Sequence, residues 1–250
     1  MTLTNAISDD SPSLEYVGAT ATILLRRPRQ HNRIDPDDIA VIRSHLDEIQ
    51  RRSDMRVVVF TGLGEKTFSS GYTVQAIVER LDKSFEELLD AVENFPLPTI
   101  CALNGSVYGG ATDLALCCDI RIGVRHSRMF MPAAKFGLHY YPGGLRRYVT
   151  QLGPSETKRL FLTAAAIDAE EMLRIGFLNE LLDREQLPAR VREYADAIAA
   201  CEPHTVISLK RQINAIAAGD PTAATSRDDH ERSLRSGELK RRVAAAAKRN

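Results

Sequence analysis

The chain has 250 residues, and its 33 Lys and Arg balance its 33 Asp and Glu, so the formal net charge is zero. This balance excludes the strong electrostatic attraction that carries basic proteins to nucleic acids or to anionic membrane surfaces. No apolar run approaches the roughly 20 residues needed to cross a bilayer. Hydrophobic residues make up 44% and charged residues 26% of the chain, which is typical of a globular metabolic enzyme with a full core.

The four cysteines, at 101, 117, 118 and 201, include no Cys-x-x-Cys pair. They are predicted to be reduced thiols of a cytoplasmic protein, with no metal site and no disulfide framework.

Residues 1–12 are expected to be a loose tail. Its first ten residues are polar and mildly acidic, which does not match the basic and then apolar pattern of a signal peptide.

Strands and helices are expected to alternate along the chain, which favours an α/β fold with a substantial parallel sheet. The expected strands are a hairpin within residues 16–25, then 57–61, 99–103, 120–124, a short one near 129–130, and 177–182. The expected helices are 35–51, those leading to Phe95, 110–118, 143–152, 155–163, 168–175, the stretch from 187 that Pro203 breaks, and a surface helix within 232–249. Asp35-Pro36 and Asp168 are predicted to begin their helices, because Asp is a good cap and Pro suits the first helical turn.

The stretch from Asn104 to Asp119 is the most informative in the sequence. An apolar strand enters an Asn-Gly turn, a Gly109-Gly110 pair follows, and an apolar helix then begins that carries Asp113 near its start. Glycine lets the backbone approach a ligand closely, and a helix start offers unpaired N–H groups at the positive end of its dipole. The pattern predicts a place to stabilise negative charge on an oxygen, with a carboxylate one turn away.

Three blocks resemble those of the crotonase superfamily, also called the enoyl-CoA hydratase/isomerase family. They are Phe68-Ser-Ser-Gly-Tyr72, the segment from Pro98 to Arg121, and Phe130-Met-Pro-Ala-Ala-Lys-Phe-Gly-Leu138 with the Pro-Gly-Gly-Leu-Arg-Arg run that begins at Pro142. The resemblance implies a spiral of repeated ββα units, which we expect to form an α/β core over residues 1–200, with a C-terminal helical region over 201–250.

The resemblance also implies an acyl-CoA thioester enzyme whose thioester carbonyl is held by two backbone N–H groups, here those of Tyr72 and Gly110. Coenzyme A would enter as part of the substrate, so no separate cofactor is expected. The nominal reaction is hydration or dehydration of an enoyl-CoA through a thioester enolate. Family members form trimers and pairs of trimers, so a homo-oligomer is expected by analogy.

The acid and base positions depart from the family pattern. Hydratases of the family use two glutamates, and this chain has Asp113 at the first position and Ala133 at the second. We therefore expect Asp113 to activate water and to return the proton on its own. Tyr140 and Tyr141, beside His139, lie in the loop where related decarboxylases use a tyrosine, so both are candidate catalytic residues.

Two alternatives to hydration stay open at this point. The first is a decarboxylase or hydrolase of an acyl-CoA that uses a loop tyrosine. The second is a non-catalytic acyl-CoA-binding homologue in which Ala133 marks lost activity.

The loop with Arg27, Arg29, His31 and Arg33 resembles the family's segment for the nucleotide end of coenzyme A, where guanidinium groups suit phosphate.

Overall fold

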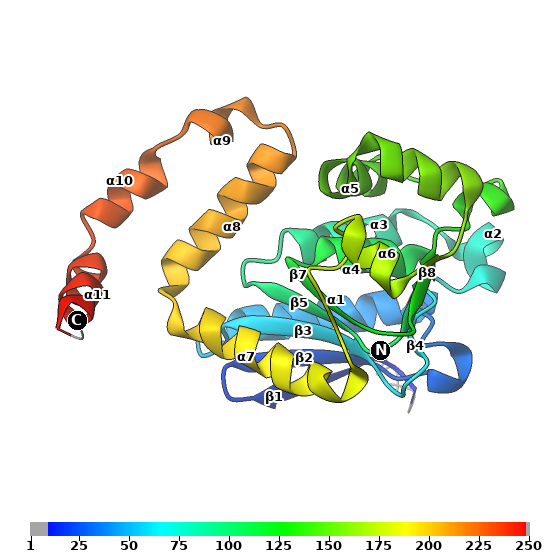
Figure 1. The fold of residues 1–250 in the computed structure, drawn as a ribbon, viewed down its shortest axis with the longest axis horizontal. Helices are drawn as coiled ribbons and strands as arrows, with labels where there is room; N and C mark the ends of the chain where they lie inside the picture. The colour runs from blue at the N-terminus through cyan, green and yellow to red at the C-terminus, as the bar shows by residue number, and fades with distance from the viewer. Residues whose placement is uncertain (1–9, 249–250) are drawn as a thin grey trace, which may run out of the picture.

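The computed structural model describes residues 10–248, and its larger sheet has six strands (Figure 1). Their order is β1 (Ser13–Val17), β2 (Thr20–Leu25), β3 (Val57–Gly62), β5 (Thr99–Leu103), β7 (Ile120–Val124) and β10 (Glu180–Leu182). The first two strands form the expected antiparallel hairpin, and every other neighbouring pair is parallel. The predicted tail falls mostly outside the described residues.

Both faces of this sheet are buried, which explains why its central strands are apolar throughout. Val57 and Val59 pack on one face against α7 (Leu187–Ala200), which lies along the sheet in Figure 1. Val58 and Phe60, whose side chains alternate with these, point into the main core on the other face.

A second, smaller sheet consists of β4 (Thr67–Ser69), β6 (Ser106–Tyr108), β8 (Arg128–Phe130) and β9 (Ile167–Asp168). The pairs β4–β6 and β6–β8 are parallel, and β8–β9 is antiparallel. Only β8 was expected from the sequence, because strands of two or three residues are too short to show an alternating pattern.

The chain alternates between the two sheets and then forms a helix, three times over. Strands β3 and β4 lead to α2 (Ile77–Arg80) and α3 (Lys83–Glu93), β5 and β6 lead to α4 (Gly110–Cys117), and β7 and β8 lead to α5 (Pro142–Thr163). This confirms the predicted α/β spiral of ββα units.

Helix boundaries follow the capping residues that the sequence indicated. The first helix, α1 (Pro36–Arg51), begins with a capping box between Asp35 and Asp38, and α6 (Ala169–Arg174) begins where the Asp168 carboxylate accepts from the Glu171 N–H. Gly153, with a φ of 77°, interrupts α5 between the two helices expected there. Short 3-10 turns occupy Pro28–Gln30, Val74–Ala76, Ala133–Phe136 and Arg184–Gln186.

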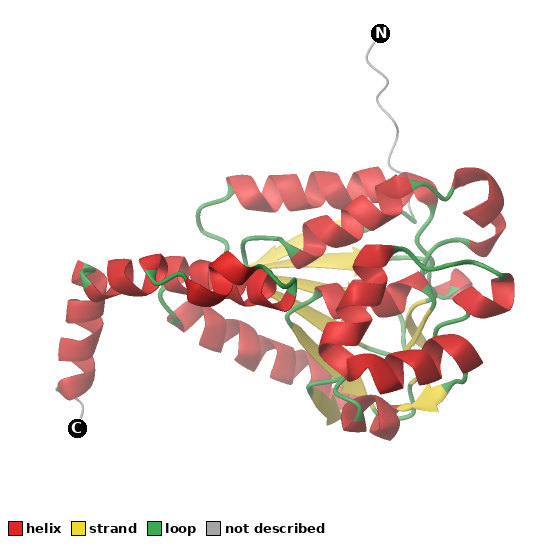
Figure 2. Ribbon diagram, turned by 90° about the horizontal axis from the view of Figure 1, so that it is seen from above, coloured by secondary structure: helices red, strands yellow, loops and turns green. Residues whose placement is uncertain are grey.

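The last four helices extend away from the sheets as an arm (Figures 1 and 2). They are α8 (Pro203–Ala217), α9 (Pro221–Thr225), α10 (Asp228–Leu234) and α11 (Gly237–Ala247). Apolar side chains remain exposed along the arm, namely Leu209, Ile213, Ile216, Leu234, Leu239 and Val243. Within residues 10–248, none of the helices combines the length and the apolar character required to cross a membrane.

The turn that joins β5 to β6 has no room for a side chain at Gly105. A Cβ there would lie 2.5 Å from the carbonyl carbon of Lys66 and 2.6 Å from the Thr67 nitrogen, both of which are backbone atoms. We predict that Gly105→Ala lowers the free energy of unfolding by about 1–3 kcal/mol, since the two backbones must separate. Urea denaturation measures the loss.

Gly237→Ala is the matched control for this substitution. A Cβ at Gly237, the first residue of α11, meets nothing within 4 Å. That variant should unfold at the urea concentration of the parent or slightly above it. Equal midpoints for the Gly105 variant and the control would show that this close approach does not constrain the fold.

Candidate functional site

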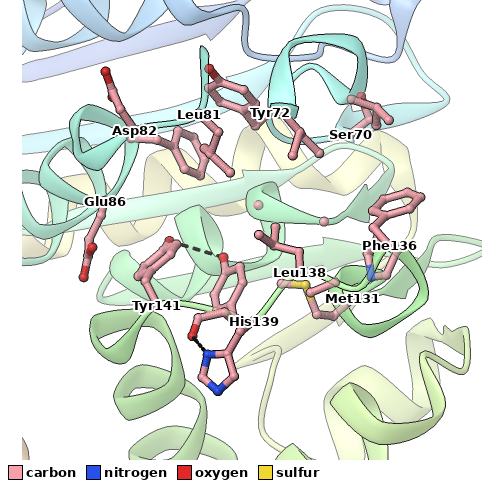
Figure 3. A pocket seen from close by; sticks show the side chains of 18 of the residues that line it. Ser70, Tyr72, Leu81, Asp82, Glu86, Met131, Phe136, Leu138, His139 and Tyr141 are labelled. Carbon is pink, nitrogen blue, oxygen red and sulfur yellow. Dashed lines mark hydrogen bonds between the residues drawn. The ribbon is translucent and has the colours of Figure 1, made fainter. Parts of the chain in front are cut away.

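A cavity of about 340 Å³ lies where the three parallel strands of the smaller sheet end (Figure 3). Each strand leads directly into its wall: β4 into Ser70 and Tyr72, β6 into Gly109 and Gly110, and β8 into residues 131–133. Ligands commonly bind at the carboxyl ends of parallel strands, because the loops that follow can vary without disturbing the sheet. The wall is completed by Val74, Ile77, Leu81, Asp82, Lys83, Phe85, Glu86, Phe136, Leu138, His139, Tyr140 and Tyr141.

The amides of Tyr72 and Gly110 lie beside each other in this wall. A Cβ at Gly110 would be 3.6 Å from the Tyr72 nitrogen, and a Cβ at Gly71 would be 2.6 Å from the Gly110 nitrogen. Only glycine fits at position 71, which also has a φ of +78°. Within residues 10–248, neither the Tyr72 N–H nor the Gly110 N–H donates a hydrogen bond to a protein acceptor. Two unpaired donors, one at the start of α4 and one in the loop after β4, can therefore receive an oxygen that carries negative charge.

Asp113 is fully buried on α4, and four donors converge on its carboxylate. The Arg147 Nε lies 2.8 Å from Oδ1, and the Arg147 Nη2 lies 3.1 Å from Oδ2. The hydroxyl of Tyr140 donates to Oδ2 at 3.2 Å, and that of Tyr141 donates to the same oxygen. Three of these donors converge on Oδ2 and one on Oδ1, and Asp113 is not among the residues that line the cavity.

Arg147 is the residue of this cluster that the sequence interpretation missed. Its side chain is fully buried, and its Nη1 also lies 2.8 Å from Asp90 and 2.9 Å from Glu93. Gly144, Tyr148 and Leu152 are buried on the same helix, at the spacing of one helical face. An arginine on an otherwise buried face was the signal that an acid elsewhere had to pair with it.

The two loop tyrosines are neutral hydrogen-bond donors. Burial, followed by the nearby charge of Asp113, raises the pKa of Tyr140 and of Tyr141 well above the usual value for a phenol. Their rings stack with centroids 4.4 Å apart, and their hydroxyl oxygens lie 3.2 Å from each other. The structure brings together the three candidate residues Asp113, Tyr140 and Tyr141, with the tyrosines between the buried acid and the cavity.

The position of the second family glutamate contributes no proton-transfer group. Ala133 is buried in the cavity wall and opens the short turn that ends at Phe136. His139 is exposed at the rim, and its Nδ1 lies 2.9 Å from the Tyr140 carbonyl oxygen. Of the apolar residues on α3, Leu88 and Leu89 are buried in the main core, whereas Phe85 is buried and also lines the cavity.

The arginine loop does not line the cavity. Two acids at the start of α1 form ion pairs with two of the arginines that were predicted to contact phosphate. Arg27 pairs with Asp35 at 3.3 Å and also with Asp38, and Arg33 pairs with Asp35 at 2.8 Å. His31 has its Nδ1 2.9 Å from the Thr67 hydroxyl. Arg29 is exposed and has no ion pair within residues 10–248.

Comparison with protein families and curated proteins gives one consistent result. The family model described as enoyl-CoA hydratase/isomerase matches residues 15–236. The short-chain-enoyl-CoA hydratase of Clostridium acetobutylicum is 30% identical over 208 residues, which is 80% of each chain. The carnitinyl-CoA dehydratase of Citrobacter koseri is 30% identical over 238 residues, covering 92% of this chain and 88% of that protein.

Solved structures agree with the fold described above. An enoyl-CoA hydratase from Bacillus anthracis superposes with a TM-score of 0.87 at 25% identity, covering 96% of this chain and 97% of that one. DspI of Pseudomonas aeruginosa superposes with a TM-score of 0.86 at 27% identity, over 98% of both chains.

The buried ion pair between Asp113 and Arg147 leads to a stability prediction. Replacing Arg147 with Met leaves three buried or half-buried carboxylates without their common partner, so we expect a loss of about 3–5 kcal/mol in the free energy of unfolding. Arg146→Met is the neighbouring control, because Arg146 is 32% exposed and pairs only at the edge of the cluster; it should cost no more than about 1 kcal/mol. Similar losses in the two variants would contradict this reading.

The raised tyrosine pKa values lead to a pH prediction. The folded-state pKa of these tyrosines lies above the unfolded value of about 10. Their contribution to the free energy of unfolding is therefore fully present below pH 10 and is lost as the pH rises further. Tyr140, Tyr141 and the buried Tyr148 should therefore stay neutral in the folded protein. The phenolate absorbance of a Tyr140→Phe/Tyr141→Phe variant should match that of the parent until either protein unfolds. A smaller amplitude in the folded variant would show that these tyrosines do ionise.

Proposed function

This chain belongs to the enoyl-CoA hydratase/isomerase family, and we propose that it catalyses the reversible addition of water to an enoyl-CoA. The observation that carries the proposal is the pair of unpaired amide donors, from Tyr72 and Gly110, in the wall of a largely apolar cavity. An acyl group suits the apolar side chains around it, and the thioester oxygen suits the two donors. Relatives named as hydratases and dehydratases support the same chemistry.

In this proposal the two amides form an oxyanion hole. As water adds to C3 of the enoyl group, electrons of the double bond move toward the thioester carbonyl and negative charge develops on its oxygen. Donors already fixed in place stabilise that charge without reorganisation, and removing one such donor costs about 10²–10³-fold in kcat in well-studied enzymes.

We propose that Asp113 is a positioning residue for the tyrosines. Its carboxylate accepts from both hydroxyls and from Arg147, so it holds Tyr140 and Tyr141 in one arrangement beside the cavity. The sequence interpretation gave Asp113 the proton transfer itself. The full burial of Asp113, its absence from the cavity wall and the three donors on its Oδ2 favour positioning over contact with a water molecule in the cavity.

The same hydrogen bonds weigh against the alternative in which a loop tyrosine drives decarboxylation or hydrolysis. Each phenol has one proton to donate, and both are directed at the Asp113 carboxylate. A decarboxylase would need one of these hydroxyls to turn toward the substrate. Release of CO₂ from malonyl-CoA by the purified protein would favour that alternative.

We propose that Arg29 is the main phosphate contact within the arginine loop, with His31 beside it. Arg27 and Arg33 are committed to Asp35 and Asp38, and their guanidinium groups are less available to an incoming phosphate. Coenzyme A would arrive with the substrate, and no other cofactor is proposed.

We further propose that the protein acts in the cytoplasm as a homo-oligomer, a trimer or a hexamer. Three buried free thiols suit a reducing compartment. The exposed apolar side chains of the arm supply a surface that a neighbouring subunit could cover.

The test of the proposed reaction compares the parent protein with two glycine variants. The parent should add one water to crotonyl-CoA, read as a mass gain of the thioester or as loss of its conjugated absorbance. Gly71→Ala places a Cβ 2.6 Å from the Gly110 nitrogen, so we predict a loss of about 10²–10³-fold in kcat. The loss should appear in kcat rather than in the affinity for the CoA portion.

Gly18→Ala is the matched control, since Gly18 also has a positive φ of +57° but a Cβ there meets nothing within 4 Å. It carries the backbone strain without the contact at the cavity, so its kcat should equal that of the parent. No water addition by the parent, or equal kcat values for the Gly71 and Gly18 variants, would refute the proposed role of this site.

A further inference from the structure

The structure leaves the proposed hydration without an obvious proton carrier. Asp113 lies outside the cavity wall, and position 133 is alanine. Two other carboxylates do line the cavity, and both come from α3 and its cap. Asp82 caps that helix, where its carboxylate accepts from the Ser84 N–H at 2.8 Å and is exposed. Glu86 is the other.

Glu86 has no competing partner. Its side chain is half-buried, and within residues 10–248 no hydrogen bond or ion pair engages its carboxylate. By contrast, Asp90 and Glu93, on the same helix, are both bound by Arg147. Among the carboxylates of α3 that face α5, Glu86 is thus the one that is left able to exchange a proton with a bound molecule.

Glu86 has the cavity wall beside its backbone and α5 beside its carboxylate. The preceding residue, Phe85, packs its ring so closely under Gly110 that a Cβ there would lie 2.8 Å from it, and the same ring meets Tyr72 edge-on with centroids 5.3 Å apart. On the other side, the Glu86 Oε1 would be 3.4 Å from a Cβ at Gly143, in the first turn of α5. Glu86 thus follows a residue that packs against the amide pair, its carboxylate lies near the start of α5, and Figure 3 shows it at the edge of the cavity on the side of Tyr141.

We propose that Glu86 is the catalytic residue that transfers the proton in water addition, an inference that rests on the proposed function. The water oxygen bonds to C3 of the enoyl group while its proton passes to the Glu86 carboxylate. The C2–C3 π electrons shift toward C1, and the carbonyl electrons move onto the thioester oxygen, giving an enolate. When the enolate collapses, C2 takes the proton from Glu86, so one water has been added and the carboxylate is restored.

The charged and titratable groups around Glu86 come from three elements. Asp82, Lys83 and Asp90 lie on α3 or its cap, Arg147 lies on α5, and His139 and Tyr141 lie in the loop before it. Tyr141 is neutral and Arg147 is cationic throughout the working range, so the imidazole of His139 is the neighbouring group that needs its own control variant.

The central experiment measures crotonyl-CoA hydration by Glu86→Gln beside Glu87→Gln. We expect the Glu86 variant to lose at least about 10²-fold in kcat, with little change in KM, because a positioned proton carrier contributes about 10²–10⁴-fold. Glu87 is the matched control: it is the next residue on the helix, its side chain is 61% exposed, and it pairs at the surface with Arg43. Its kcat should equal that of the parent.

Two further variants separate proton transfer from a structural role. Glu86→Asp keeps the carboxylate and should recover part of the lost kcat, which a purely structural role would not require. The acidic limb of the pH–kcat profile should disappear in Glu86→Gln and survive in His139→Asn. An acidic limb that instead follows His139, or a Glu86→Gln kcat within about threefold of the parent value, would overturn the proposal, since proton carriers contribute far more.

A second measurement distinguishes failure of this inference from failure of the proposed reaction. Butyryl-CoA in D₂O should exchange its C2 hydrogens, read by mass, because removing one of them gives the same enolate without any water addition. Exchange by the parent and its loss in Glu86→Gln would support Glu86 even if crotonyl-CoA were not hydrated. Exchange that persists in Glu86→Gln, or a parent that neither hydrates nor exchanges, would overturn it.

Discussion

The ion pair between Asp113 and Arg147 is the interaction on which the rest of the site depends. Both side chains are fully buried, and each would be costly to bury alone. Asp113 lies in the first turn of α4, which begins at Gly110, whereas Arg147 lies in the second turn of α5, which follows the loop with the two tyrosines. The pair therefore connects the donor side of the cavity to its hydroxyl side. Asp90 and Glu93 extend the same network to α3.

The cavity wall therefore has two kinds of hydrogen-bond donor: amides that have no protein acceptor and hydroxyls that already donate to Asp113. The amides of Tyr72 and Gly110 are fixed by tight glycine contacts and have no protein acceptor within the described chain. The tyrosine hydroxyls are equally well placed, but their protons are already directed at Asp113. A ligand oxygen thus meets open donors at one wall and occupied donors at another, which favours one orientation of a thioester in the cavity.

The sequence predicted the large sheet well because strands such as β3 and β5 are apolar over their full length and are followed by clear turn residues. It missed most of the small sheet, since three residues at β4 or β6 carry no periodic signal. Motif resemblance predicted Tyr72 and Gly110 as a donor pair, and the structure places them side by side in the cavity wall, because glycines constrain those positions locally. The position of Arg147 on a buried helical face was a signal that the interpretation did not use, and the sequence does not show which acid pairs with it, because the two residues are 34 positions apart. The sequence interpretation also did not place Glu86 in the cavity wall, since a surface acid and a cavity acid look the same in a helical pattern.

The pairing of β4 with β6 has one more consequence. Ser69 is in register with Val107, and the chain reaches Tyr72 three residues after the first and Gly110 three residues after the second. The pairing of these adjacent strands, which lie about 4.8 Å apart in any sheet, therefore brings the two segments that carry the amides close together. The hydrogen bonds that pair these strands are made by the backbone, so the spacing of the strands does not depend on which side chains they carry. Side chains around the site, those of Asp113 and Ala133 among them, can therefore change without moving the strands that carry the two amides.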